Sequence, residues 1–243
     1  MIRLLLLSLS FIIFSHTALA TCKINNAVIG AKYKITIQNI KTDKNNTRYL
    51  LLWRNNKQVA QQLSDTDITE VWEQTNNGQL RLIRYFDKHY RGIEYDPNEI
   101  NIGKRNKNWD VKSQLIADNF IKSMHKKSIN GKGCEKTTHY ILKSNHKKIS
   151  LSWLSKQRLI KTYSETTVSD KIKWELIKVI TNKKQINNVF TIRSDYQTTD
   201  YADIGDNESD PFLVKMINLG FVEHAASGFY DTNGNKLTRH HQH

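Results

Sequence analysis

The feature that most constrains the fold of this chain is a series of short segments in which apolar and polar residues alternate. In residues 33–40, for example, Tyr33, Ile35 and Ile37 alternate with polar side chains. A period of two is typical of a β-strand that buries one face and exposes the other. The same pattern, or a short apolar run, predicts further strands at residues 49–54, 69–74, 80–86, 92–95, 137–143, 148–154, 158–166, 171–180 and 189–193.

Two helices are expected among these strands. A short late helix is predicted to begin at Asp210, which suits the N-cap, with Pro211 at the first helical position and Gly220 at its end. A single mid-chain helix is predicted over residues 109–124 because apolar residues recur there close to the helical period, namely Trp109, Leu115, Ile116, Phe120 and Met124.

The order of these elements favours an α+β fold with a large, curved antiparallel sheet built as a meander. Asn76-Asn77-Gly78 lies between two of the expected strands and is a strong hairpin signal. Such a sheet must bury one face. One mid-chain helix and one short late helix, lying in the curve of the sheet, would bury it.

Residues 49–59, with the sequence YLLLWRNNKQV, resemble a passage of strand, Trp-Arg, turn and strand in the outer-membrane lipoprotein-sorting proteins of bacterial envelopes. The likeness extends over residues 30–100 in the order of the elements. It implies the lipoprotein-carrier fold, in which helices plug the concave face of a meandering sheet. Known members of that family carry acyl chains in an apolar cavity, so the resemblance also implies lipid binding and transport.

The first twenty residues have the pattern of a secretory signal peptide. Arg3 precedes an apolar run over residues 4–14, and the small residues Ala18 and Ala20 end the segment. The run is shorter than the roughly 20 apolar residues of a membrane-spanning helix. We therefore expect a cleaved signal peptide at residues 1–20, a single α+β domain at 21–238 and a disordered tail at 239–243, in a periplasmic protein.

The chain has two cysteines, Cys22 and Cys134. An even number of cysteines in an exported protein predicts one disulfide between them. Two alternatives stay open. Leu19-Ala20-Thr21-Cys22 nearly matches a bacterial lipobox, although Thr21 departs from it, so that Cys22 would be lipid-anchored. The two thiols would otherwise be free.

The chain is strongly basic, with 37 Lys and Arg against 23 Asp and Glu and a formal net charge of +14. Such a charge attracts anionic partners through a long-range field. Outside the cytoplasm, an anionic membrane surface is a more natural partner than nucleic acid, which we do not expect. The charge has a second explanation, in which it only keeps the protein soluble. The lysines are scattered among asparagines, and a composition rich in both is typical of an AT-rich genome.

Aromatic and arginine side chains are concentrated in the first group of expected strands. Together they can hold an anionic, partly apolar ligand by stacking and by charge-assisted hydrogen bonds. Ordinary packing within a sheet explains the same pattern. The candidate ligand-binding residues are Trp53, Trp72, Arg81, Arg84, Tyr85, Arg91 and Tyr95.

Five acidic residues fall close together at Asp200, Asp203, Asp206, Glu208 and Asp210. Capping of the following helix, a hard cation or acid–base chemistry each fit this segment. The spacing matches no calcium loop, and no metal or cofactor is expected. A turn that begins at Asp231 lacks the later residues of an EF-hand, and the histidines that end the chain form no selective metal site. Serine-elbow, phosphate-loop and dinucleotide motifs are absent from the sequence.

These patterns favour an exported, non-catalytic binding or carrier protein of the envelope that holds a lipid or another amphiphilic anionic ligand. The first alternative is an envelope hydrolase that uses the acidic segment 200–210, with His224 as a partner; an enzyme is the less favoured interpretation. The second is a structural partner of an envelope complex, and the sequence does not identify a partner protein.

Overall fold

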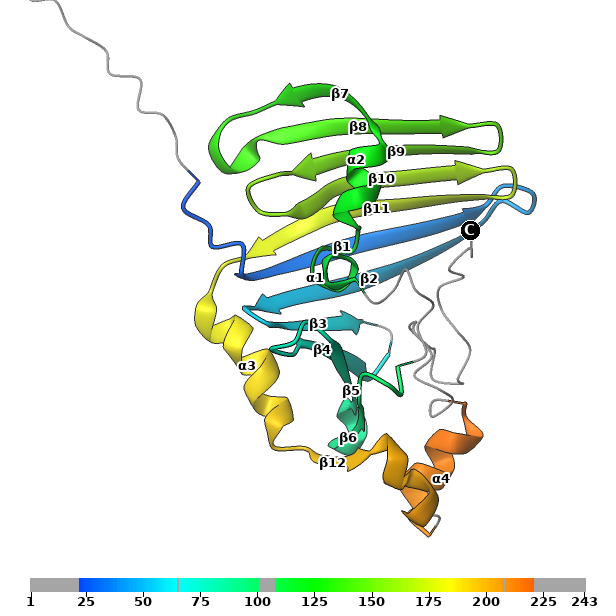
Figure 1. Cartoon of the computed structure of the whole chain (residues 1–243). Helices are drawn as coiled ribbons and strands as arrows, with labels where there is room; N and C mark the ends of the chain where they lie inside the picture. The colour runs from blue at the N-terminus through cyan, green and yellow to red at the C-terminus, as the bar shows by residue number, and fades with distance from the viewer. Residues whose placement is uncertain (1–21, 65, 101–107, 208, 221–243) are drawn as a thin grey trace, which may run out of the picture.

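The computed structural model describes residues 22–64, 66–100, 108–207 and 209–220, so the expected signal peptide and tail lie outside it. Its framework is one strongly curved sheet of 12 strands in the order β12-β6-β5-β4-β3-β2-β1-β11-β10-β9-β8-β7 (Figure 1). Neighbouring strands run antiparallel except for the last pair, β12 and β6, which are parallel. The α+β class with a large antiparallel sheet is therefore confirmed.

The sheet consists of two meanders joined at their first and last strands. β1 pairs with β2 on one side and, after a long excursion of the chain, with β11 on the other. The twelve strands are β1 (Val28–Asn39), β2 (Lys44–Asn55), β3 (Gln58–Leu63), β4 (Ile68–Gln74), β5 (Leu80–Phe86), β6 (Arg91–Tyr95), β7 (His125–Asn130), β8 (Thr137–Ser144), β9 (Lys147–Leu154), β10 (Leu159–Thr167), β11 (Asp170–Ile180) and β12 (Gln197–Asp200).

The helices divide between the two faces of the sheet. α1 (Trp109–Gln114) and α2 (Asp118–Ser123) lie on the concave face, whereas α3 (Lys183–Ser194) packs on the convex face over β1 and β2 (Figure 1). α4 (Pro211–Asn218) follows the short 3-10 helix η4 (Tyr201–Asn207) near the end of β6. Two single-turn 3-10 helices, η1 (Asp87–His89) and η3 (Gly133–Glu135), connect strands. No helix of the described residues is long and apolar enough to span a bilayer.

Alternation along each strand produces two separate cores. The larger lies on the concave face, where Leu50 and Leu52 of β2 pack with Trp72 and Leu82 of the next strands. The smaller lies between the convex face and α3, around Trp53, Val71, Ile83, Tyr85 and Ile186. Because neighbours on a strand point to opposite faces, a single strand such as β2 contributes to both cores.

The mid-chain helix expected over residues 109–124 is two short helices. α1 ends at Leu115, whose positive φ of 69° stops the helical path. Arg158 joins the two pieces: its guanidinium lies 2.7 Å from Asp118 in α2 and 3.6 Å from Asp110 in α1. The near-helical spacing of the apolar residues persists across this break because both pieces face the same core.

The prediction of a strand at residues 189–193 is wrong, because this segment lies within α3. The Asn182 side chain caps the helix by accepting a hydrogen bond from the Gln185 N–H at 3.0 Å. Ile186, Val189 and Phe190 then meet the convex core at helical spacing. Val189 and Phe190 are residue types that favour strands in isolation, and packing overrides this preference.

Cys22 and Cys134 form the predicted disulfide, with their Cα atoms 4.6 Å apart. Both sulfur atoms are used by this bond, so the lipid-anchor and free-thiol alternatives do not agree with the structure. The bond ties the segment before β1 to η3, beyond the edge strand β7. Its loop is further held where Gln157 Nε2 donates to the Cys134 carbonyl and the Gln157 carbonyl accepts from buried Arg54. A disulfide of this kind is typical of proteins that fold outside the cytoplasm.

Replacing Cys134 by serine is expected to lower the free energy of unfolding by about 2–5 kcal/mol, because the bond closes a long loop in the unfolded chain. Urea unfolding followed by tryptophan fluorescence measures the change. Reductant should destabilise the wild-type protein to the same extent and leave the variant unaffected. Two alkylatable thiols in the oxidised wild-type protein would contradict the assignment.

Candidate functional site

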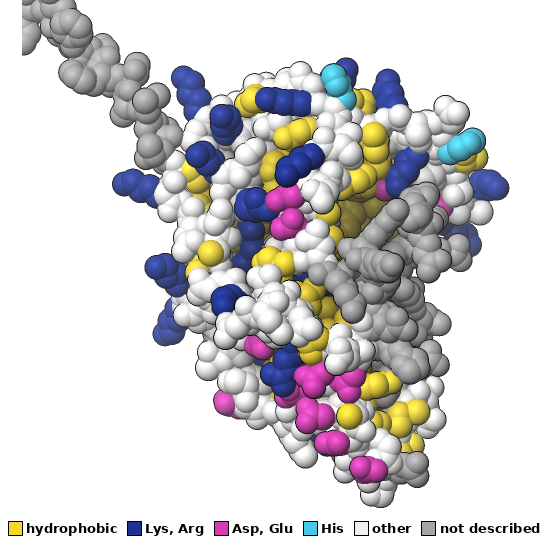
Figure 2. Space-filling model, viewed as in Figure 1, with side chains coloured by type: hydrophobic (Ala, Val, Ile, Leu, Met, Phe, Trp, Pro, Cys, Tyr) yellow, Lys and Arg dark blue, Asp and Glu magenta, His cyan; other side chains and the backbone are white. Residues whose placement is uncertain are grey.

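The concave face of β8 to β11 presents apolar side chains that the described helices cover only in part. The strand register sets them side by side: Tyr163 pairs with both Trp174 and Leu151, and Tyr140 also pairs with Leu151. Hydrophobic side chains accordingly lie on this face over β8 to β11, which are called the upper strands from their place in Figure 1 and Figure 2. Those that are half-buried and pack against the concave core are Ile37, Tyr140, Leu142, Tyr163, Trp174 and Leu176.

A polar group is embedded in this apolar surface near the turn that connects β10 to β11. Glu165 is buried and accepts a hydrogen bond from the Tyr163 hydroxyl, while Lys147 Nζ lies 2.8 Å from the other carboxylate oxygen. Burial, followed by the Glu165 carboxylate, raises the pKa of Tyr163 well above its ordinary range. Tyr163 therefore stays a hydrogen-bond donor, and Glu165 is satisfied from both sides.

A second polar cluster lies deeper on the same face, beneath α1. Arg84 and Glu70 form an ion pair of 2.8 Å whose side chains are 0% and 5% exposed. The Arg84 guanidinium carbon also lies 5.7 Å from the centre of the Tyr95 ring. Because both side chains are buried, removing either one would leave the other as an unpaired buried charge, which is costly.

Lys112 brings a further charge into this cluster from α1. Its Nζ lies 3.7 Å from the centre of the Trp72 ring, and its carbonyl accepts a hydrogen bond from Gln61 at 2.7 Å. Burial lowers the pKa of Lys112 to about 8, against the attraction of Glu70, which acts in the opposite direction. α1 is therefore attached to β3 through the Lys112 carbonyl and to β4 through the buried Lys112 side chain.

The predicted ligand-binding residues are divided by the sheet. Trp72, Arg84 and Tyr95 come together on the concave face in the buried cluster just described. Trp53 lies on the convex face and rests against Gly30, where an added Cβ would come within 2.7 Å of the indole ring. Their part in ligand binding stays a prediction.

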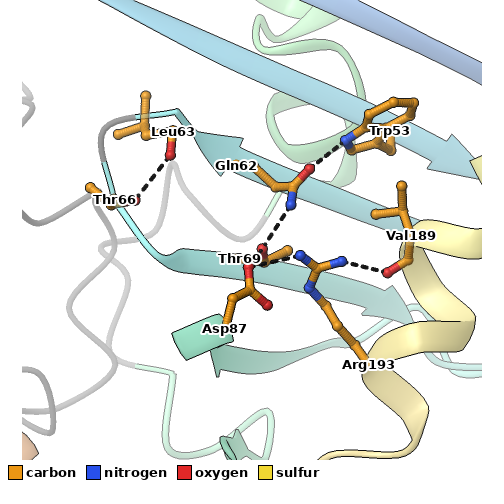
Figure 3. A network of polar contacts seen from close by, with 8 residues as sticks. All are labelled: Trp53, Gln62, Leu63, Thr66, Thr69, Asp87, Val189 and Arg193. Carbon is orange, nitrogen blue, oxygen red and sulfur yellow. Dashed lines mark hydrogen bonds and ion pairs between the residues drawn. The ribbon is translucent and has the colours of Figure 1, made fainter. Parts of the chain in front are cut away.

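Trp53 belongs to a chain of hydrogen bonds that fastens α3 to the sheet (Figure 3). Its Nε1 donates to Gln62 at 2.7 Å, and Gln62 donates to Thr69 at 3.0 Å. The Thr69 hydroxyl donates in turn to Asp87 at 2.6 Å, and Asp87 is paired with Arg193 of α3 at 2.7 Å. The contacts of Trp53 in this network give it a structural role on the convex face.

The remaining three candidates also have contacts within the protein. Tyr85 packs edge-to-face on Tyr196 beneath α3, and burial raises the pKa of Tyr85 to about 12. Arg81 forms an ion pair with Glu94 on the same face. Arg91 reaches Asp210 at 2.7 Å and lies over the ring of Phe212, so that it holds α4 against the end of β6.

The acidic segment is used for capping at its last residue. The Asp210 carboxylate accepts from the Phe212 N–H at 2.8 Å, as expected of an N-cap. The guanidinium of Arg91 holds the pKa of Asp210 below its ordinary value. Glu208 and His224 lie outside the described residues. Among the described residues, no three His, Cys, Asp or Glu side chains gather in a way that would hold a metal ion.

A small hollow lies between η1 and α4. Its volume is about 180 Å³, below the roughly 300 Å³ at which ligand pockets usually begin. Its polar and charged lining residues are Thr66, Asp67, Lys88, His89 and Lys215. Its apolar lining residues are Ile68, Phe86, Met216 and Leu219. The hollow is too small for an acyl chain with its headgroup, so the concave face is the stronger candidate.

Sequence reasoning missed the residues that make up the open concave surface. Tyr140, Tyr163 and Trp174 fall within predicted strands, yet they become neighbours only through the register of four strands. Lys112 was missed because a lysine in an amphipathic helix is ordinarily exposed. The nearest available signal was alternation itself, which assigns these aromatic residues to the apolar face of their strands.

No protein-family model and no curated protein sequence matches the chain. Solved structures do match. PNGF-II aligns with 72% of this chain and 32% of its own, at a TM-score of 0.40 and 9% identity, so this chain spans about a third of that protein. A putative outer membrane lipoprotein-sorting protein domain from Vibrio parahaemolyticus aligns with 70% of this chain and 92% of its own, at a TM-score of 0.34 and 8% identity.

A LolA superfamily protein from Nitrosomonas europaea aligns with 63% of this chain and 86% of its own, at a TM-score of 0.30 and 8% identity. Lipoprotein-sorting domains are thus among the matches, as the resemblance of residues 49–59 implied. These three TM-scores are all below 0.5.

Replacing Glu70 by glutamine is expected to lower the free energy of unfolding by about 3–5 kcal/mol, because the carboxylate that faces both Arg84 and Lys112 is removed. The matched control is Asp67→Asn, which breaks the exposed ion pair with Lys88 and should change stability by less than about 1 kcal/mol. Both values come from urea unfolding. Equal effects of the two substitutions would contradict the buried cluster.

The stability of the wild-type protein, relative to a Lys112→Met variant, is expected to rise as the pH increases from about 8 toward 10.5. Below this window Lys112 is charged in both states, and burial of the charge opposes folding. Within it the folded state has lost the proton while the unfolded state keeps it, so stability increases with pH, by up to about 3 kcal/mol. Urea unfolding at several pH values measures the difference. A flat difference would show that Lys112 is not buried.

Proposed function

We propose that the chain is an exported, non-catalytic binding or carrier protein of the bacterial envelope that holds a lipid or another anionic amphiphile on its concave face. The observation that supports this most directly is the set of half-buried apolar side chains on β1, β8, β10 and β11. Apolar side chains left partly in contact with water gain free energy when an acyl chain covers them. The basic charge and the disulfide support an exported protein with an anionic ligand.

The apolar part of the ligand would lie across Tyr163 and Trp174, where aromatic faces offer large contact areas. The anionic part would meet lysine at the rim. Lys126 of the edge strand β7 is exposed and pairs with Tyr140 in the register, so it lies beside the apolar surface. The Arg84 cluster is buried beneath α1 and is proposed to support α1.

A cleaved signal peptide at residues 1–20 remains part of this proposal, as does the periplasmic location that it implies. The two alternative functions gain no specific support. Asp210 of the acidic segment is engaged with Arg91 and with the first turn of α4. If the protein bound no ligand at all, that result would favour the role of a structural partner in an envelope complex.

Replacing Trp174 by alanine is expected to weaken the binding of a fluorescent acyl-chain probe by about tenfold, because one large apolar contact is lost. Titration of the purified protein with the probe measures the affinity. Ile192→Ala, which truncates an exposed side chain of α3 on the opposite face, should bind as the wild type does. An amphiphile that copurifies with the protein should appear by mass spectrometry of an organic extract. Unchanged binding by the Trp174 variant would contradict the proposed site.

A further inference from the structure

Three hairpin turns gather at one end of the upper sheet. They connect β1 to β2 at residues 40–43, β8 to β9 at residues 145–146 and β10 to β11 at residues 168–169. Figure 1 shows them together at the right-hand end of the strands. The first and the third are in direct contact, because the Ile40 N–H donates to the Ser169 carbonyl at 2.8 Å. We call these turns and the residues that flank them the hairpin end.

Two aliphatic side chains project from this end into solvent. Ile40 is 46% exposed and Val168 is 71% exposed. Their turns are ordered: the Asn39 side chain accepts from the Lys41 and Thr42 N–H groups, and the Thr167 hydroxyl accepts from the Asp170 N–H. The exposure of these two aliphatic side chains is therefore set by well-formed turns.

Exposed lysines lie in these turns or within two residues of them. Lys148 pairs with Lys143 on one side and with Thr166 on the other, and Thr166 pairs with Lys171, so the three lysines share one row of the sheet. Like charges directly opposite each other oppose folding. The exposed lysines of the hairpin end that have no ion pair among the described residues are Lys41, Lys44, Lys143, Lys148 and Lys171.

The acidic residues of the hairpin end are already engaged. Glu165 is paired with Lys147, and Asp43 accepts a hydrogen bond from Gln38 at 2.8 Å. Asp170 accepts from the Ser169 hydroxyl at 2.6 Å. Hydrogen bonds from neutral groups leave Asp43 and Asp170 charged, but the five lysines without an ion pair outnumber these two carboxylates, so the net charge of this end is positive.

We propose that the hairpin end docks on an anionic phospholipid bilayer, with Ile40 and Val168 inserted among the headgroups and the five lysines on lipid phosphates. Exposed apolar side chains with lysines on the same turns and the adjoining strand ends suit the interface of an anionic membrane, where burial of apolar area and electrostatic attraction act together. Ile40, Val168 and the five lysines are not among the side chains of the concave apolar surface, and the inference does not rest on ligand binding there.

Docking at this end would have a geometric consequence. The concave row of the sheet that passes through Ile37, Ile172 and Glu165 lies one row inside the last pair, Asn39 opposite Asp170, and so is close to the same turns. The end of the apolar concave surface would then face the bilayer.

The test is cosedimentation with vesicles of phosphatidylglycerol and phosphatidylethanolamine, compared with neutral phosphatidylcholine vesicles. The protein and its variants are purified alike from the cell envelope, so that all have the same N-terminus. Wild-type protein should bind the anionic vesicles selectively, and less at high salt. The double variant Ile40→Glu/Val168→Glu should lose about tenfold in partition coefficient or more. Ile192→Glu, whose side chain is 47% exposed on α3, is the matched control and should bind as wild type.

The lysines are tested by Lys143→Gln/Lys148→Gln, with a loss of about fivefold for each lysine removed. The exposed pair Lys183→Gln/Lys184→Gln on α3 is the control. If circular dichroism shows that the Ile40→Glu/Val168→Glu variant is not folded, the Ile40→Ser/Val168→Ser variant is used in its place. Acyl-probe affinity should be unchanged in all of these variants, which separates docking from ligand binding. Docking is overturned if the wild type fails to prefer anionic vesicles, or if either hairpin-end variant binds like its control.

Discussion

The pairing of β1 with β11 is the interaction on which the rest of the structure depends. The two strands are separated by more than half of the chain, and their ladder runs from Gly30 opposite Ile180 to Asn39 opposite Asp170. Without this ladder, the meander of β1 to β6 and the meander of β7 to β11 would be separate sheets with open edges. With it, Tyr33 and Ile35 of β1 meet Leu176 and Trp174, and one concave face extends across both halves.

The two faces of this continuous sheet are stabilised in different ways. On the convex side, α3 covers the lower strands and is fastened through partly buried polar contacts from Trp53 to Arg193. On the concave side, α1 and α2 cover the middle, and the buried ion pair of Glu70 and Arg84 lies beneath them. The upper concave strands retain half-buried aromatic residues instead. The proposed function follows from this difference, because it is where apolar area remains accessible to a ligand.

Local pattern predicted most of the sheet because most strands bury one face. It failed where that condition fails: all six residues of β7 are exposed, so the segment gives no alternation to detect. α3 was misread for the opposite reason, since Val189 and Phe190 favour strands locally and only packing against the convex core makes them helical. The disulfide was predictable because the chain has two cysteines and the signal-peptide pattern indicates export.

The candidate site was predictable only in part. Trp72, Arg84 and Tyr95 do come together, but Trp53 and Tyr85, on neighbouring parts of the sequence, point to the other face. Alternation assigns residues to two faces within a strand; it does not say which strands are neighbours. The relation of Tyr163 to Trp174 and Tyr140 depends on pairings between distant segments, and such pairings are decided by the whole core.

The central claim is that the concave face of the upper strands holds the apolar part of an amphiphile. Photocrosslinking with a phospholipid that has a photoreactive group in its acyl chain, followed by peptide mass spectrometry, tests it most directly. We expect adducts on the concave residues of β8, β10 and β11, with Tyr140, Tyr163 and Trp174 foremost. Adducts confined to α3 and the convex face, or an absence of adducts under conditions that label a known lipid carrier, would contradict it.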